Sequence, residues 1–171
     1  QIKSQSSNTA EVFNLETSVT PVKQAWLTNT QVNFCAKAYA GVTLNHPDSA
    51  ALTVLAVFMR NGFLHTNIRE KGGAYGGGAS FDAESASFRF YSYRDPRLVE
   101  TLQDFDRSID WVVSNTHEPR LLEEAILGVI GSLDKPGSPA GEAKDAFQNQ
   151  LFGRTAVIRQ AFRQSVLSVS L

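Results

Sequence analysis

The chain has 171 residues, of which 42% are hydrophobic and 19% charged, and this composition is typical of one globular domain with a single core. Its formal net charge of −1 and the scatter of its 16 Lys and Arg residues argue against a nucleic-acid partner. No apolar run is long enough to cross a bilayer and no segment has the pattern of a signal peptide, so we expect no membrane partner.

Two units are predicted from the N-terminus onward. Residues 1–20 are polar and rich in serine, so we expect a weakly structured lead-in or linker there, followed by one domain over residues 21–171. Trp26 and Leu27 are predicted to belong to a first strand of that domain. Because the chain begins with Gln1 and stops inside a helical pattern, we expect it to be a fragment of a longer chain.

Residues 31–40 alternate with the two-residue period of a half-buried strand. The predicted inner face consists of Val32, Phe34, Ala36, Ala38 and Ala40. Its small side chains favour a helix packed closely against it. Cys35, the single cysteine, falls on the other face, and no nearby base is evident, so we expect a structural thiol and not a nucleophile.

Residues 48–70 are predicted to form one long helix whose first half is deeply buried, with Gly62 marking a kink or a close contact. A glycine-rich run over residues 72–78 is predicted to end that helix, because each glycine in a helix interior lowers its stability. Residues 79–81 and 87–93 then read as the two strands of a hairpin. In the second strand one face is predicted to carry Phe88 and Phe90, and the other Arg89, Tyr91 and Tyr93.

Everything after Pro96 is predicted to be helical. Apolar residues recur at helical spacing from Leu98 to Val112, again after Pro119, and finally from Ile158 to Val169, while Ser138 and Pro139 begin a further helix that ends near Gly153. Three arginines are expected to form a solvated face, namely Arg154, Arg159 and Arg163. Antiparallel strands with helices grouped on one face predict an α+β domain of two layers.

The glycine-rich run has two interpretations besides a flexible connection. A phosphate loop requires a strand, then glycines, then a helix N-terminus, whereas here a helix precedes the glycines and a strand follows, which argues against phosphate binding. Glycine also lets another backbone approach closely, so the strand edge could accept an extended peptide. Arg69 and Tyr75 would then be placed to donate hydrogen bonds to that peptide.

Residues 68–78 (IREKGGAYGGG) resemble the arginine–tyrosine segment of the pitrilysin-type zinc metallopeptidases. The six-residue step from Arg69 to Tyr75 is similar to the presequence-protease branch, and residues 63–66 (FLHT) and 91–96 (YSYRDP) strengthen the likeness. The resemblance implies the metalloprotease-like fold, also called LuxS-type, and a C-terminal domain that holds no zinc.

Such peptidases are built from two large halves that close around an unstructured peptide. The resemblance implies that Arg69 holds a substrate carbonyl and that Tyr75 donates to the carbonyl oxygen as it becomes an oxyanion, so both are predicted catalytic residues. The predicted substrate-binding residues are Arg69, Gly72, Gly73, Tyr75, Gly76 and Gly77. The expected partners are therefore a peptide substrate and the N-terminal half of the same polypeptide.

The family's His-x-x-Glu-His zinc motif is not found in this sequence. The three histidines, His46, His65 and His117, are too far apart in sequence to form it, so we expect no metal or other cofactor in this chain and no peptidase activity from the chain alone. The resemblance implies that zinc is bound by the N-terminal half of the complete enzyme. The sequence leaves the compartment open, and the resemblance favours a bacterial cytoplasm or an organelle matrix.

Two alternatives remain open from the sequence. One is a metal-free peptide-binding or scaffold subunit of the same fold, although retention of Arg69 and Tyr75 favours the enzyme. The other is a freestanding acyl-transfer catalyst, but no Ser, Cys or Thr lies in a recognisable nucleophile elbow. Faces that would meet a neighbouring domain also make self-association of the fragment an expectation.

Overall fold

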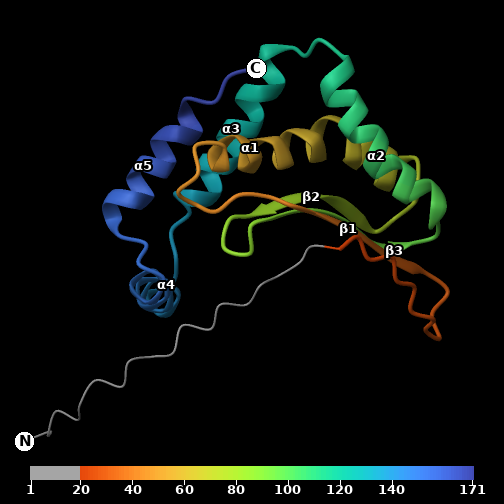
Figure 1. Cartoon of the computed structure of the whole chain (residues 1–171), viewed down its shortest axis with the longest axis horizontal. Helices are drawn as coiled ribbons and strands as arrows, with labels where there is room; N and C mark the ends of the chain where they lie inside the picture. Colours follow the sequence, from red (N-terminus) through yellow and green to blue (C-terminus); the bar gives the residue numbers. More distant parts are fainter. Residues whose placement is uncertain (1–19) are drawn as a thin grey trace, which may run out of the picture.

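A sheet of three antiparallel strands, with helices packed on one of its faces, forms the centre of the fold (Figure 1). The structure is a computed structural model that describes residues 20–171, so the predicted lead-in lies outside the described residues apart from its last position. The elements in chain order are β1 (Asn33–Ala40), α1 (Ser49–Met59), the π-helix η1 (Arg60–Glu70), β2 (Gly76–Asp82), β3 (Ser87–Asp95), α2 (Val99–Ser114), α3 (Pro119–Leu133), α4 (Pro139–Leu151) and α5 (Ala156–Leu167). The predicted α+β fold of two layers is confirmed.

Strand β3 is the centre of the sheet, which has the order β1-β3-β2 with both pairings antiparallel. Phe88 and Phe90 are buried on the side that the helices cover, while Tyr91 and Tyr93 are exposed on the other side. The predicted division of the two faces of β3 is therefore confirmed.

The predicted inner face of β1 is wrong. Cys35 is buried, whereas Phe34 is 58% exposed and Ala36 is also exposed. The register explains the difference, because Cys35 pairs with Ser92 and so shares the helix-covered face of β3. Both faces of β1 carry apolar residues, and alternation alone cannot tell which of two such faces a helix will cover.

Trp26 and Leu27 do not form a strand, which corrects another prediction. Their relative exposures are 83% and 102%, and neither pairs with a described strand. Two apolar residues become a strand only where a neighbouring strand supplies hydrogen-bond partners, and the edge of β1 is not paired with them.

The long helix predicted for residues 48–70 is present, but it changes its winding at Arg60. Its second half is η1, in which the closing hydrogen bond runs from the Lys71 amide to the Thr66 carbonyl over 2.9 Å. Gly62 lies where a Cβ atom would be 2.4 Å from the Trp111 ring, so the predicted close contact is confirmed.

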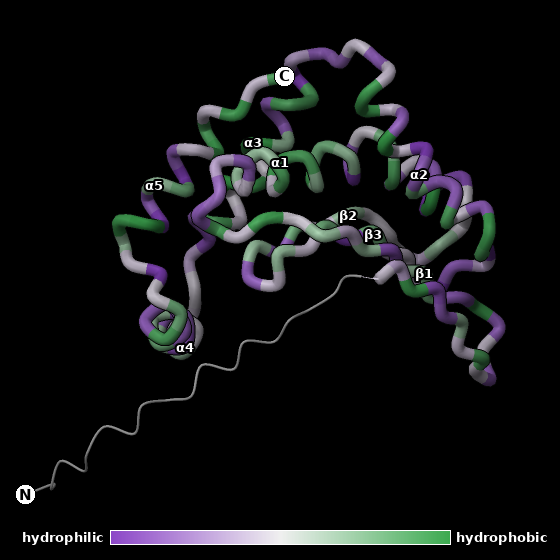
Figure 2. Tube along the Cα trace, viewed as in Figure 1, coloured by the Kyte–Doolittle hydropathy of each residue, from purple (hydrophilic) through white to green (hydrophobic). Residues whose placement is uncertain are grey.

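Helix α1 lies between the sheet and the C-terminal helices, and Figure 2 shows hydrophobic residues along it. On one side of the helix layer a buried cluster joins Cys35, Met59, Leu64, Ile68, Phe90 and Phe105. A second cluster joins α1 to α3 and α5 through Val54, Phe58, Ala125, Val129 and Val166. These two clusters hold the α1–η1 helix in place, and with it the segment that leads from Glu70 into β2.

We predict that Gly62→Ala destabilises the domain by about 1–3 kcal/mol, the usual range for overpacking. The Trp111 ring that the new methyl group would strike is stacked on Phe58, with 5.3 Å between centroids, so it cannot move aside freely. Urea unfolding of both proteins measures the difference in the free energy of unfolding.

The matched control is Gly131→Ala in α3, where an added Cβ meets nothing within 4 Å. Its helical propensity should raise stability by up to about 1 kcal/mol. Equal unfolding free energies for the two variants would contradict the contact between Gly62 and Trp111.

Candidate functional site

The segment between η1 and β2 carries the predicted site. Arg69 lies in the last turn of η1, and Tyr75 directly precedes Gly76, the first residue of β2. The segment is tied down on both sides: the Gly73 amide donates to the Arg69 carbonyl over 3.0 Å, and the Tyr75 amide donates to the Arg94 carbonyl over 3.4 Å. The structure thus brings Arg69 and Tyr75 to the same end of one edge strand.

Strand β2 begins earlier than the sequence predicted. We expected the glycine run to precede a strand that starts at Ala79, but Gly76 and Gly77 already pair with Tyr93 and Ser92 of β3. Hydrogen bonding to β3 overrides the low strand propensity of glycine. Among the described residues β2 pairs only with β3, so its other edge remains unpaired, as strand addition by a peptide requires.

Packing within the domain accounts for two of the glycines predicted to bind substrate. Gly72 is buried, and a Cβ there would lie 1.9 Å from the Nη2 atom of Arg97 and 2.4 Å from the backbone carbonyl oxygen of Ile68, which cannot move aside as a side chain can. At Gly77 a Cβ would lie 2.7 Å from the Cγ2 atom of Ile68 in η1. Glycine is therefore needed at both positions to let the helix and the arginine approach the backbone, whatever their role toward a substrate.

The other two glycines of the prediction have different surroundings. Gly73 has φ of +80°, a left-handed conformation in which a side chain would be strained. Gly76 is half-buried, and a Cβ there would meet nothing within 4 Å, so open space lies beside the backbone at the start of β2. Substrate contact at all four glycines stays a prediction.

Arg69 and Tyr75 both present their polar groups to solvent. Tyr75 is 69% exposed and Arg69 is also exposed. Within residues 20–171 neither the guanidinium nor the phenol has a hydrogen-bond or ion-pair partner. Two unpaired donors beside an unpaired strand edge can bind a carbonyl or carboxylate of an extended chain.

The ring of Tyr75 is held from the side of β3. It meets Tyr93 edge-on, with 5.8 Å between centroids, and the guanidinium carbon of Arg94 lies 6.0 Å from its centroid. Tyr93 in turn meets Phe34 of β1 edge-on at 5.2 Å. Neither Tyr93 nor Arg94 is among the predicted site residues, and no pattern in the sequence indicates that either residue contacts Tyr75.

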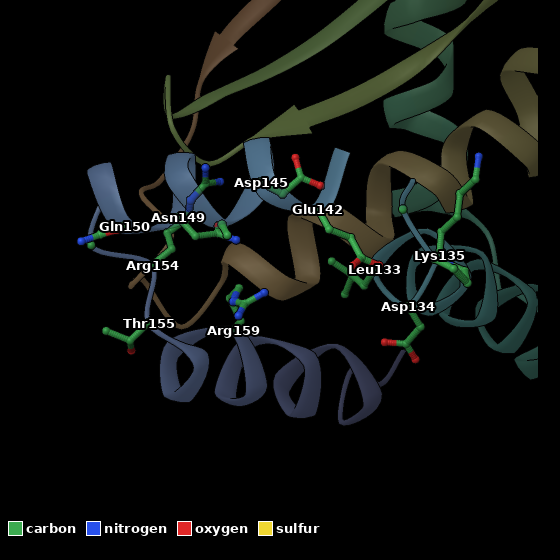
Figure 3. A pocket seen from close by; sticks show the side chains of 14 residues that line it. Leu133, Asp134, Lys135, Glu142, Asp145, Asn149, Gln150, Arg154, Thr155 and Arg159 are labelled. Atoms are coloured by element: carbon green, nitrogen blue, oxygen red, sulfur yellow. The ribbon is translucent and has the colours of Figure 1, made fainter. Parts of the chain in front are cut away.

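An open pocket of about 730 Å³ lies elsewhere, between the end of α3, helix α4 and helix α5, and Arg159 lines it together with Asp145 and Asn149 (Figure 3). Neither Arg69 nor Tyr75 lines this pocket. The candidate site is thus an open surface on this domain.

The predicted solvated arginine face is only partly correct. Arg159 is exposed, as expected, but the side chain of Arg154 is only 26% exposed and pairs with Glu84 over 2.5 Å. Arg163 makes a bidentate pair with Asp134, from Nε to Oδ1 and from Nη2 to Oδ2, and this hydrogen bonding lowers the pKa of the aspartate. Glu84 is 70 residues from Arg154 in sequence, and Asp134 is 29 residues from Arg163. Local sequence patterns therefore cannot predict either ion pair.

The histidines of the described chain do not fit a zinc site. His46 lies beside Asp48, His65 lies beside Glu70, and His117 packs edge-on against the stacked rings of Phe58 and Trp111. No three His, Cys, Asp or Glu side chains converge to hold a metal ion anywhere in residues 20–171. A catalytic zinc requires at least three such ligands.

A protein-family model described as the PreP C-terminal domain matches residues 23–171. The chain belongs to this family. It is 41% identical over 139 residues to the mitochondrial presequence protease of Mus musculus, covering 81% of this chain. Identities of 40% and 39% relate it to the mitochondrial presequence proteases of Kluyveromyces lactis and Saccharomyces cerevisiae, each over 82% of this chain.

The matched relatives are much longer than this chain. The alignments cover only 13% of the mouse protein and 14% of each yeast protein. The chain therefore spans only a small part of the length of these relatives. In the part of the chain that the structure describes, no helix combines the length and apolarity that a membrane span requires.

Cys35 is predicted to react slowly with alkylating reagents. Burial raises the pKa of its thiol, more than the hydrogen bond with Ser92 lowers it, and the nearby charge of Asp95 raises it further. A raised pKa keeps the thiol neutral at pH 8, and only the thiolate is nucleophilic. Iodoacetamide should therefore modify the folded chain at least about tenfold more slowly than the urea-unfolded chain.

The same measurement repeated at several pH values provides the control. The rate for the folded chain should keep rising above pH 9.0, the ordinary value for a thiol, because the raised pKa delays formation of the thiolate. Equal rates for the folded and unfolded chains at pH 8 would show an activated cysteine and contradict the structural role.

Proposed function

We propose that this chain is the C-terminal, metal-free domain of a zinc-dependent presequence protease that degrades unstructured peptides inside a chamber of two halves. The observation that carries the proposal is the pair of exposed, unpartnered donors, Arg69 and Tyr75, at the open edge of β2 in a member of the PreP C-terminal domain family. Arg69 and Tyr75 can act on a peptide only if another part of the protease holds that peptide against the edge of β2.

The N-terminal half of the same polypeptide is the proposed partner. The relatives named presequence protease are about seven times longer than the aligned part of this chain, which leaves room for that half. The histidines described here do not fit a zinc site, so we assign the zinc to the N-terminal half and expect the isolated chain to be inactive. Because those relatives are named mitochondrial, an organelle matrix is the proposed compartment.

The two side chains would act at different stages. The Arg69 guanidinium offers several donors in a planar fork, which suits it to hold a carbonyl or carboxylate of the bound peptide. The Tyr75 phenol offers one donor, which would stabilise the scissile carbonyl oxygen as negative charge develops on it. An extended peptide added to the edge of β2 would lie beside both groups.

We predict that Tyr75→Phe lowers kcat of the complete protease by roughly 10²–10³, the usual effect of losing one oxyanion donor. KM should change little, since the donor matters most after the carbonyl oxygen becomes charged. Steady-state cleavage of an unstructured fluorogenic peptide measures both constants.

Tyr91→Phe is the matched control, because Tyr91 is 40% exposed on the same side of the sheet and does not belong to the proposed site. It should keep the parent kcat. Parent-level turnover of Tyr75→Phe would refute the catalytic assignment, and retained peptide binding in that case would favour the metal-free scaffold.

Arg69→Ala should raise KM about tenfold or more, because a charged donor to the bound peptide is lost before any reaction occurs. A fall in kcat can accompany it if the peptide is misplaced. Arg120→Ala, at an exposed position of α3, should leave both constants unchanged. An unchanged KM for Arg69→Ala would rule out its binding role.

A further inference from the structure

Strand β3 is interrupted by a β-bulge directly beside Tyr75. In the pairing with β1, Asn33 lies opposite Asp95 and Cys35 opposite Ser92, so the single residue Phe34 faces both Tyr93 and Arg94. A bulge of this kind bends the strand and redirects its side chains. Here it occurs where Gly76 pairs with Tyr93, one residue from the candidate catalytic tyrosine.

Arg94 adopts a conformation that is unfavourable for an arginine. Its φ of +49° lies in the left-handed region, which glycine would occupy at lower energy. The other non-glycine residue with positive φ in the described chain, Ala86, lies in the turn before β3, where such values are ordinary. Strain that persists within a strand points to a use for the side chain that causes it.

Both residues of the bulge hold Tyr75. The Arg94 guanidinium lies over the ring at 6.0 Å from its centroid, and the Arg94 carbonyl accepts a hydrogen bond from the Tyr75 amide at 3.4 Å. Tyr93 meets the ring edge-on. In the described chain the Arg94 side chain has no hydrogen-bond or ion-pair partner, so its contact with Tyr75 is the interaction that the strained conformation provides.

The residue after the bulge anchors it. Asp95 is fully buried and accepts hydrogen bonds from the Thr101 hydroxyl at 2.7 Å and from the Arg97 amide at 2.9 Å. These bonds fix the end of β3 against α2, so the backbone cannot relax by shifting the bulge along the strand. A strained residue persists only where its surroundings determine its conformation in this way.

We propose that Arg94 is a positioning residue for Tyr75: the bulge presents the guanidinium to one face of the ring and the Tyr93 ring to its side, and together they fix the direction of the phenol. This inference rests on the proposed role of Tyr75 as an oxyanion donor. A donor aids the reaction only when it is already aimed at the place where charge will develop, so loss of the contact between Arg94 and Tyr75 should reduce kcat while the bound state is little affected.

The deciding variant is Arg94→Gly in the complete protease, because glycine keeps the left-handed backbone and removes only the side chain. We expect kcat on the fluorogenic peptide to fall about three- to tenfold, with KM unchanged, and the unfolding midpoint to stay at or above that of the parent. Arg94→Lys, which retains a cation, should recover at least half of the lost kcat.

A double-mutant cycle separates positioning from a general structural effect. In the Tyr75→Phe background the hydroxyl is already absent, so Arg94→Gly should cause no further fall in kcat. An equal fall in both backgrounds, a parent-level kcat for Arg94→Gly, or a rise in KM alone would each overturn the positioning role. If Tyr75→Phe itself keeps the parent kcat, the proposed function fails, which is a different result from a failure of Arg94 alone.

Discussion

The close approach of η1 to β2 is the contact on which the candidate site depends. It is possible because glycine occupies the positions in β2 that face neighbouring side chains: a Cβ would be 2.7 Å from Ile68 at Gly77 and 2.8 Å from Arg60 at Gly78. A larger residue at Gly77 would push the helix away from the sheet, and one at Gly78 would displace the Arg60 side chain. Five residues, among them Tyr75, connect the end of η1 to β2 and depend on this close packing.

A buried ionic network secures the same segment from the side of α2. Arg97 lies over Gly72 and donates to the Asn67 carbonyl at 3.0 Å and to Asp104 at 3.1 Å, and Arg107 donates to the second oxygen of Asp104 at 2.5 Å. Since Asp104 is almost fully buried, each of its oxygens needs such a partner. The rigid support beneath the segment contrasts with the exposed side chains that it presents.

The strained bulge in β3 belongs to the same arrangement. It adds support for Tyr75 from the outer face of the sheet, while the glycines allow support for the backbone from the helix face. In the proposed role of oxyanion donor, a phenol held from both sides would lose little freedom when it binds the developing charge.

Much of the fold followed from local pattern, because apolar period, turn residues and helix-starting prolines act over a few residues. The hairpin, the long helix and the first-turn prolines at Pro119 and Pro139 were predictable in this way. The covered face of β1 was not, because Phe34 and Cys35 are both apolar and only the register with β3 distinguishes them. Whether Trp26 and Leu27 form a strand likewise depended on whether a neighbouring strand was available to pair with them.

For the candidate site, the sequence by itself determined which chemical groups are present and how they are spaced: a guanidinium and a phenol six residues apart, within a run of glycines. Tertiary structure alone decided that Gly76–Gly78 lie in an edge strand, that Arg97 covers Gly72, and that Arg94 lies beside Tyr75. The physical reason is the sequence distance over which each interaction acts. Helix and turn preferences arise from neighbouring residues, whereas strand pairing, bulges and close backbone contacts arise between segments that meet only after folding.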